Sequence, residues 1–89
     1  MSQQRTDNDY VIDALLKGLQ VLEGLEGDHF EPVKLRRLQE RTRLPYDTCM
    51  RAMKTLKVAG LAVETDRGWR LSARFIAFCR RAAEAQIEV

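Results

Sequence analysis

Apolar residues recur at helical spacing through the first third of the chain and predict a helix over residues 10–26. Spacings of three and four define one row, which we expect to face the core: Ile12, Leu15, Leu16, Leu19 and Leu22. A second row follows the rhythm of a helix–helix seam: Val11, Ala14, Gly18, Val21 and Leu25. Two interpretations of this second row stay open, namely cover by the C-terminal helix of the same chain and a dimer interface.

The middle of the chain predicts two further helices. Residues 27–29 form a turn, and Pro32 favours a short extended piece over residues 30–33 because it disfavours helix at the residue before it. A second helix follows over residues 34–42, with Leu35 and Leu38 directed inward and arginines outward. A tight connection at residues 43–44 leads to a third helix over residues 45–59, which Pro45 can open and Gly60 can end.

The third helix has two chemically distinct sides. The side expected to face the core carries Cys49, Ala52, Met53 and Leu56. The opposite side carries Asp47, Arg51, Lys54 and Val58, and it is flanked by Thr48, Met50, Thr55 and Lys57. The exposed side of this helix is therefore basic and rich in hydrogen-bonding groups.

The rest of the chain predicts a hairpin and a last helix. Residues 61–65 and 69–71 form two strands joined by a turn at residues 66–68, where Gly68 accepts a positive φ. A helix then covers residues 73–87, with a wide apolar side made of Phe75, Phe78, Cys79 and Ala82, and with Ile76, Ala83 and Ile87 beside them. The predicted fold class is mainly α with a small β-hairpin wing, a winged helix-turn-helix with an additional C-terminal helix.

The length of 89 residues allows one domain. We expect a flexible N-terminus over residues 1–9, a winged helix-turn-helix domain over 10–72, and a C-terminal helix over 73–89 that serves packing or dimerisation. No apolar run is long enough for a signal peptide or a membrane span, so we expect a cytoplasmic protein without a membrane partner.

The residues that usually carry catalysis or bind metals are few. Cys49 and Cys79 lie among apolar residues at helical spacing, so both are expected to be reduced, buried thiols. His29 is the only histidine, and it stands in the predicted turn. Neither a catalytic set nor a zinc site can be assembled from these residues. The sequence predicts no enzyme, no metal and no cofactor.

Charge is distributed unevenly along the chain, although the formal net charge is only +2. Residues 1–31 carry seven acidic and two basic side chains, whereas residues 34–57 carry eight basic and two acidic ones. Such a basic block indicates a polyanionic partner, although a charged run can also be a solvated helix face.

Residues 14–75 resemble the N-terminal DNA-binding domain of the IclR family of bacterial transcription regulators. The run ALLKGLQVLE at residues 14–23 is similar to the opening helix of that domain, and LRRLQERTRLP at residues 35–45 to its helix-turn-helix. The most specific part is the spacing Leu-Pro-x-x-Thr-x-x-Arg-x-x-x-Thr-Leu over residues 44–56.

The resemblance implies a recognition helix that begins at Pro45, with DNA contacts from Tyr46, Asp47, Thr48, Met50 and Arg51, and a wing tip near Arg67. Physical chemistry indicates the same helix, because Arg51 can pair with guanine, Thr48 can bind a phosphate or a thymine edge, and lysines suit phosphates. The full set of candidate DNA-contacting residues is Arg36, Arg43, Tyr46, Asp47, Thr48, Met50, Arg51, Lys54, Thr55, Lys57 and Arg67.

Three departures from the family pattern matter. Arg43 stands in the turn where the family usually has glycine. Asp47 stands where a small hydroxyl residue is usual, and its carboxylate could cap the helix or accept a bond from a cytosine amino group. The resemblance includes no large effector-binding domain, so the sequence gives no support for a small-molecule effector.

The leading interpretation is a homodimeric, sequence-specific transcriptional regulator that inserts the helix over residues 45–59 into the major groove of an inverted repeat in double-stranded DNA. The expected dimer interface comprises Val11, Ala14, Gly18, Val21, Leu25, Phe75, Phe78 and Ala82. The alternative is a winged-helix protein-interaction module of a larger assembly that does not bind DNA.

Overall fold

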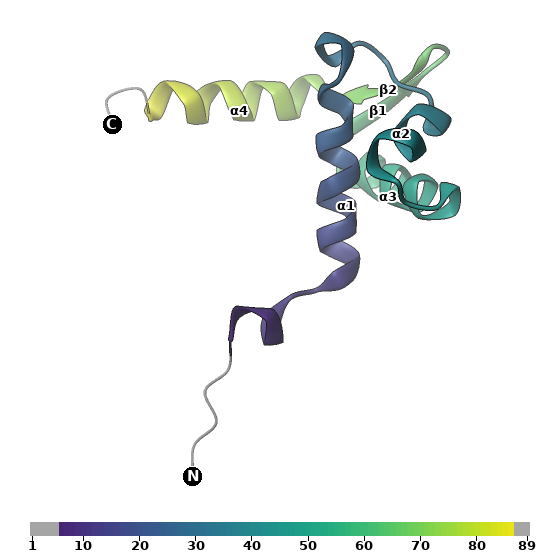
Figure 1. The fold of residues 1–89 in the computed structure, drawn as a ribbon. Helices are drawn as coiled ribbons and strands as arrows, with labels where there is room; N and C mark the ends of the chain where they lie inside the picture. The colour runs from purple at the N-terminus through teal and green to yellow at the C-terminus, as the bar shows by residue number, and fades with distance from the viewer. Residues whose placement is uncertain (1–5, 87–89) are drawn as a thin grey trace.

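The computed structural model describes residues 6–86 and contains four α-helices and one hairpin in this part of the chain (Figure 1). Three helices come first, α1 (Asp13–Glu23), α2 (Leu35–Thr42) and α3 (Tyr46–Val58). The strands β1 (Ala62–Thr65) and β2 (Gly68–Leu71) follow, and α4 (Ala73–Ala85) comes last. A 3₁₀ turn at Gly24–Glu26 replaces the end of the first helix expected from the sequence, and further single 3₁₀ turns lie at Asp7–Tyr10 and Asp28–Phe30.

The two strands pair antiparallel and form the wing. Ala62 lies opposite Leu71 and Thr65 lies opposite Gly68, so the hairpin turns over Asp66 and Arg67. Val33 forms an isolated antiparallel bridge with Trp69, which attaches the chain before α2 to the strand β2 of the wing. We expected an extended piece over residues 30–33, and Val33 is the one residue of it that pairs with a strand.

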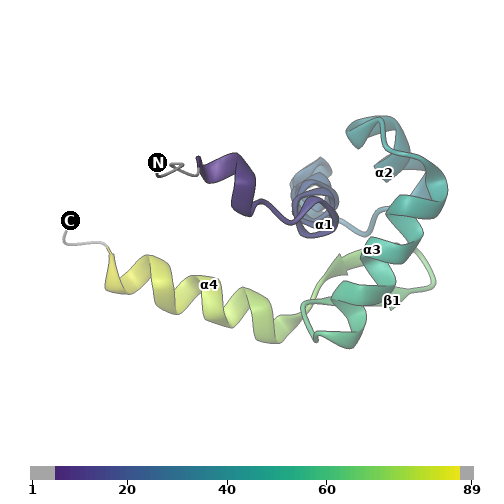
Figure 2. The ribbon, with the colours of Figure 1, turned by 90° about the horizontal axis from the view of Figure 1, so that it is seen from below.

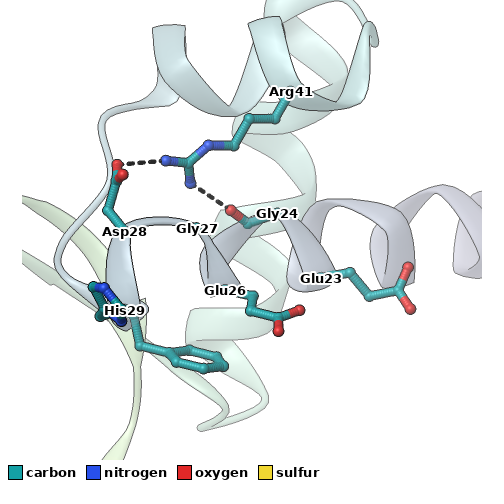
Figure 3. A pocket seen from close by; sticks show the side chains of 8 residues that line it. Glu23, Gly24, Glu26, Gly27, Asp28, His29 and Arg41 are labelled. Atoms are coloured by element: carbon teal, nitrogen blue, oxygen red, sulfur yellow. Dashed lines mark hydrogen bonds and ion pairs between the residues drawn. The ribbon is translucent and has the colours of Figure 1, made fainter.

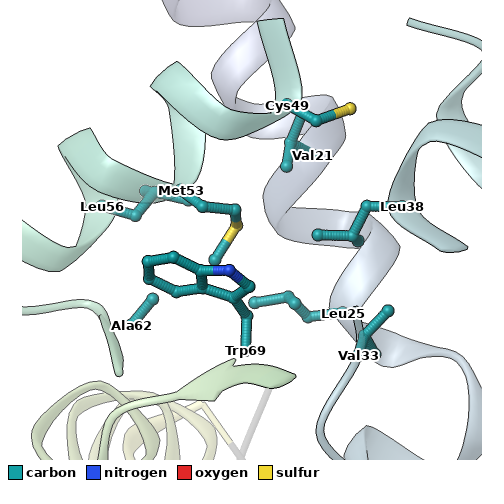
Figure 4. Close-up of a cluster of buried hydrophobic side chains, with 9 residues drawn as sticks. All are labelled: Val21, Leu25, Val33, Leu38, Cys49, Met53, Leu56, Ala62 and Trp69. Atoms are coloured by element: carbon teal, nitrogen blue, oxygen red, sulfur yellow. The ribbon is translucent and has the colours of Figure 1, made fainter. Parts of the chain in front are cut away.

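A small hydrophobic core lies where α1, α2, α3 and the wing meet (Figure 4). Its buried members are Val21, Leu25, Val33, Leu38, Cys49, Met53, Leu56, Ala62 and Trp69. The inner row of the third helix was predicted correctly from the sequence, because Cys49 and Met53 are fully buried and Ala52 packs against the core. The indole of Trp69 lies among these side chains and joins the wing to the helices.

The connection between α2 and α3 is a tight turn. Arg43 ends α2 in the left-handed conformation, with φ 60° and ψ 22°, where the resembled family usually has glycine. Pro45 is the N-cap residue of α3, so the helix begins at Tyr46, one position after the start expected from the sequence. The hydroxyl of Thr42 accepts a hydrogen bond from the Leu44 amide and so stabilises the turn.

The expectation for the faces of α1 was wrong. Val21 and Leu25, assigned to the second row, are fully buried in the core of this chain. Leu15 and Leu19, assigned to the core row, are 57% and 46% exposed, and Leu22 alone of that row packs against the core. Both rows have helical spacing, and spacing alone does not show which row meets the other elements.

The helix α4 projects away from the rest of the domain in both views (Figures 1 and 2). Ser72 caps it by accepting a hydrogen bond from the Phe75 amide, while the Ser72 hydroxyl donates to the Gly60 carbonyl. Between Ala73 and Gln86, Phe75 is half-buried and the other side chains are exposed. In the structure, α4 therefore does not cover the second apolar row of the first helix.

Exposure of α4 also corrects the expectation for the two thiols. Cys49 is buried, as predicted, whereas Cys79 is exposed. Ile87 and residues 1–5 lie outside the described residues, so the last position expected in α4 and most of the N-terminal segment 1–9 are untested. Within residues 6–86, no helix is long and apolar enough to cross a membrane.

Candidate nucleic-acid interface

The exposed side of α3 is the centre of the candidate interface. Burial of Cys49, Met53 and Leu56 on one side of the helix turns the opposite side to solvent. We call this exposed side the recognition face: Asp47, Arg51, Lys54, Thr55 and Lys57. Thr48 and Met50 are half-buried at its edges, and Tyr46 is 49% exposed at the start of the helix.

Asp47 and Arg51 form an ion pair along the helix. The Asp47 Oδ2 lies 3.0 Å from the Arg51 Nε, and the two side chains are 64% and 80% exposed. The helix start has no side-chain capping hydrogen bond, so the capping role considered for Asp47 is not what the structure shows. The backbone carbonyl of Arg51 accepts a hydrogen bond from the Thr55 hydroxyl at 2.7 Å.

Glu64 of the wing lies between the two lysines of the recognition face. Its Oε1 is 3.9 Å from the Lys54 Nζ and 3.6 Å from the Lys57 Nζ. The Lys54 ammonium also lies 6.0 Å from the centroid of the Trp69 ring, at the limit of a cation–π contact. One carboxylate therefore lowers the positive potential at both lysines.

The tip of the wing is tied to the segment before α2. Arg67 is exposed and pairs with Glu31 at 3.2 Å. The Lys34 ammonium donates to the Asp66 carbonyl at 3.3 Å. Arg67 thus lies at the tip, as the sequence predicted, and Trp69 is buried in the core.

A groove of about 480 Å³ separates the wing from the starts of α2 and α3. Arg36 and Tyr46 line one side of it, and Glu64 and Thr65 line the wing side. Arg43 lies apart from this groove, at the turn between α2 and α3. Neither Arg36 nor Arg43 pairs with a carboxylate in the described part of the chain, so both guanidinium groups remain available to an anion.

The structure thus brings most of the candidate residues of α2, α3 and the wing onto neighbouring surfaces. Sequence reasoning missed the part played by acidic residues, because Glu64 joins a strand to Lys57 of a helix and Glu31 pairs with Arg67, 36 positions away along the chain. Within the recognition face, the spacing of four between Asp47 and Arg51 was the one ion pair that the sequence signalled. No group of three His, Cys, Asp or Glu residues among positions 6–86 could hold a metal ion.

A second ion-pair cluster lies away from the recognition face (Figure 3). The Arg41 guanidinium donates to the Gly24 carbonyl at 2.7 Å and to Asp28 at 2.6 Å. These bonds hold a turn in which Asp28, His29 and Phe30 all have positive φ. The cluster connects α2 to the end of α1, so we assign it a structural role.

Three helices around a common core, a tight turn before an exposed basic helix, and a two-stranded wing define a winged helix-turn-helix domain, here with an additional C-terminal helix. An IclR transcriptional regulator from Alicyclobacillus acidocaldarius has a similar structure, with a TM-score of 0.72 and 23% sequence identity. The match covers 85% of this chain and 31% of that chain. The shared fold agrees with the resemblance found in the sequence.

The present chain therefore spans about a third of the length of that regulator. No family model matches the sequence, and no curated protein matches it. At 23% identity the likeness establishes the fold, and the activity has to be argued from the side chains.

Proposed function

We propose that this protein is a sequence-specific transcriptional regulator that binds double-stranded DNA with α3 in the major groove. The observation that carries the proposal is the recognition face, which presents Arg51, Lys54 and Lys57 on one side of a helix whose other side is buried. A helix of this kind in a helix-turn-helix fits the major groove, where arginine reads guanine and lysines contact phosphates. Such a regulator would act in the cytoplasm.

The cations around the recognition face support the same proposal. Arg36 and Arg43 have free guanidinium groups, and Arg67 is held at the wing tip by one exposed ion pair. With Lys54 and Lys57, these residues give five candidate phosphate contacts per chain. We expect log K for duplex DNA to fall with log[salt] with a slope of about −4 to −5 for each bound chain.

The test is titration of random-sequence duplex DNA with the protein at several salt concentrations. An Arg36→Ala/Arg43→Ala variant should bind more weakly and reduce the slope by roughly two units. The matched control is Arg80→Ala/Arg81→Ala, which removes the same charge from exposed positions on α4 and should leave the slope unchanged. Binding that is absent, or that does not depend on salt, would contradict the proposal and favour a protein-interaction module.

We further propose that the regulator is a homodimer formed through α1 and α4. Val21 and Leu25 are no longer part of the proposed interface, because they are buried within the chain. Of the other expected interface residues, Val11, Ala14, Phe78 and Ala82 are exposed, and Gly18 and Phe75 are half-buried.

The exposed apolar surface is larger than the sequence indicated. Leu15, Leu16 and Leu19 on α1 are 57%, 48% and 46% exposed, and Phe78 on α4 is 57% exposed. Leu15 and Leu19 line a groove of about 570 Å³ between α1 and α3, and Phe75 and Ile76 line one of about 500 Å³ beside the start of α4. Exposed large apolar side chains that line grooves are typical of an association site, and a two-fold dimer would match an inverted-repeat operator.

A further inference from the structure

The ion pair between Asp47 and Arg51 is the feature of the recognition face that the proposed function does not explain. A carboxylate directed toward DNA is repelled by phosphates, and an exposed pair of this spacing contributes little to stability. Both side chains are mostly exposed, and neither has another side-chain partner in the described part of the chain. The pair therefore has no evident role in holding the fold together.

The atoms that form the pair indicate a role in recognition. The Asp47 Oδ2 contacts the Arg51 guanidinium at Nε, at 3.0 Å. A guanidinium group is a planar fork with five N–H donors, and its two terminal nitrogens point away from Nε. Contact at Nε leaves these terminal nitrogens free for the O6 and N7 atoms of guanine, which accept a bidentate pair in the major groove.

We propose, on the basis of the proposed DNA binding, that Asp47 is a specificity-determining positioning residue that holds Arg51 in the orientation that reads guanine. Fixing one end of a long side chain reduces the conformational freedom that Arg51 loses on binding. The Asp47 carboxylate also opposes the pairing of Arg51 with a backbone phosphate, so it lowers the affinity for sequences that lack the guanine.

This role makes an unusual prediction about affinity. Removal of the Asp47 charge should raise the affinity for random DNA by roughly twofold to fivefold, because one repulsive charge is lost. The same change should reduce discrimination for guanine at one base pair by about tenfold, because Arg51 then also pairs with phosphates. An ordinary surface ion pair would affect all sequences equally.

The experiment compares the wild-type chain with Asp47→Asn, Arg51→Ala and the double variant. Sites are selected from random duplexes with the wild type, and affinities are then measured for the selected site and for each base substitution within it. Glu84→Gln, an exposed position on α4, is the control for the change in net charge. Unfolding in urea checks that all variants fold.

We expect Asp47→Asn and Arg51→Ala to lose discrimination at the same base pair, and the double variant to discriminate no worse than Arg51→Ala alone. Unchanged discrimination in Asp47→Asn would overturn the positioning role, as would a loss at a different base pair, which would show that Asp47 reads a base itself. A wild-type chain that selects no sequence would instead refute the proposed function.

Discussion

The backbones of Val33 and Trp69 are joined by two hydrogen bonds, with the Val33 amide donating to Trp69 at 2.8 Å and the Trp69 amide donating to Val33 at 2.7 Å. This bridge fixes the wing against the segment that leads into α2. Because Trp69 is also buried in the core, the position of the wing relative to the recognition face depends on the same contacts that stabilise the fold.

Gly68 is expected to be essential for this bridge. Its φ is +134°, and a Cβ atom there would lie 2.6 Å from the Val33 carbonyl carbon. We expect Gly68→Ala to lower the free energy of unfolding by about 3 kcal/mol or more, because strain and a backbone clash add together. Urea denaturation measures the loss, and a variant as stable as the wild type would contradict this account of the wing.

Arg43 is expected to destabilise the turn that it occupies. A residue with a Cβ at φ 60° costs roughly 1 kcal/mol relative to glycine in the left-handed region. Arg43→Gly should therefore raise the free energy of unfolding by about 0.5–1 kcal/mol and weaken DNA binding, because a proposed phosphate contact is lost. Urea denaturation and DNA titration check the two effects, and a loss of stability would show that the arginine side chain supports the turn.

We expect Glu64 to lower the affinity of the recognition face for duplex DNA. It lies 3.6 Å from Lys57 and 3.9 Å from Lys54, so its removal frees both lysines for phosphates. Glu64→Gln should raise the affinity for specific and random duplexes alike, whereas Lys57→Ala should lower both and reduce the salt slope by roughly one unit. A change confined to one sequence would mean that these residues contact bases.

Gly18 offers a test of the dimer that spares the fold. A Cβ atom at this position would meet no atom within 4 Å in the chain, so Gly18→Glu should remain folded. We expect this variant to sediment as a monomer, because the charge would be buried against a second copy. Gln20→Glu, at an exposed position on the same helix, is the control and should stay dimeric. A wild-type chain that is monomeric at micromolar concentration, both free and on DNA, would rule out the dimer.

The faces of α3 could be predicted from the sequence, whereas those of α1 could not. On α3 the apolar row of Cys49, Met53 and Leu56 lies opposite charged residues, so only one side could enter the core. On α1 apolar residues occupy both sides, and the choice of Val21 over Leu15 and Leu19 depends on where the other elements lie. Periodicity along one helix carries no information about that placement.

The ion pairs of the recognition face also differ in whether the sequence could predict them. The pairing of Asp47 with Arg51 follows from their spacing on one helix, so it could have been anticipated. The contact between Glu64 and Lys57 joins a strand to a helix, and it exists only because the wing folds back beside α3. Counting basic residues in the sequence therefore overstated the positive charge that the recognition face presents.

The central claim is sequence-specific DNA binding by the recognition face, and selection of binding sites from random duplexes with the full chain tests it most directly. The account predicts enrichment of an inverted repeat whose half-sites are centred about one helical turn, roughly 34 Å, apart, with a guanine in each half-site whose preference disappears in Arg51→Ala. Recovery of unenriched sequences after repeated rounds, or of a site whose base preferences are unchanged in Arg51→Ala, would contradict it.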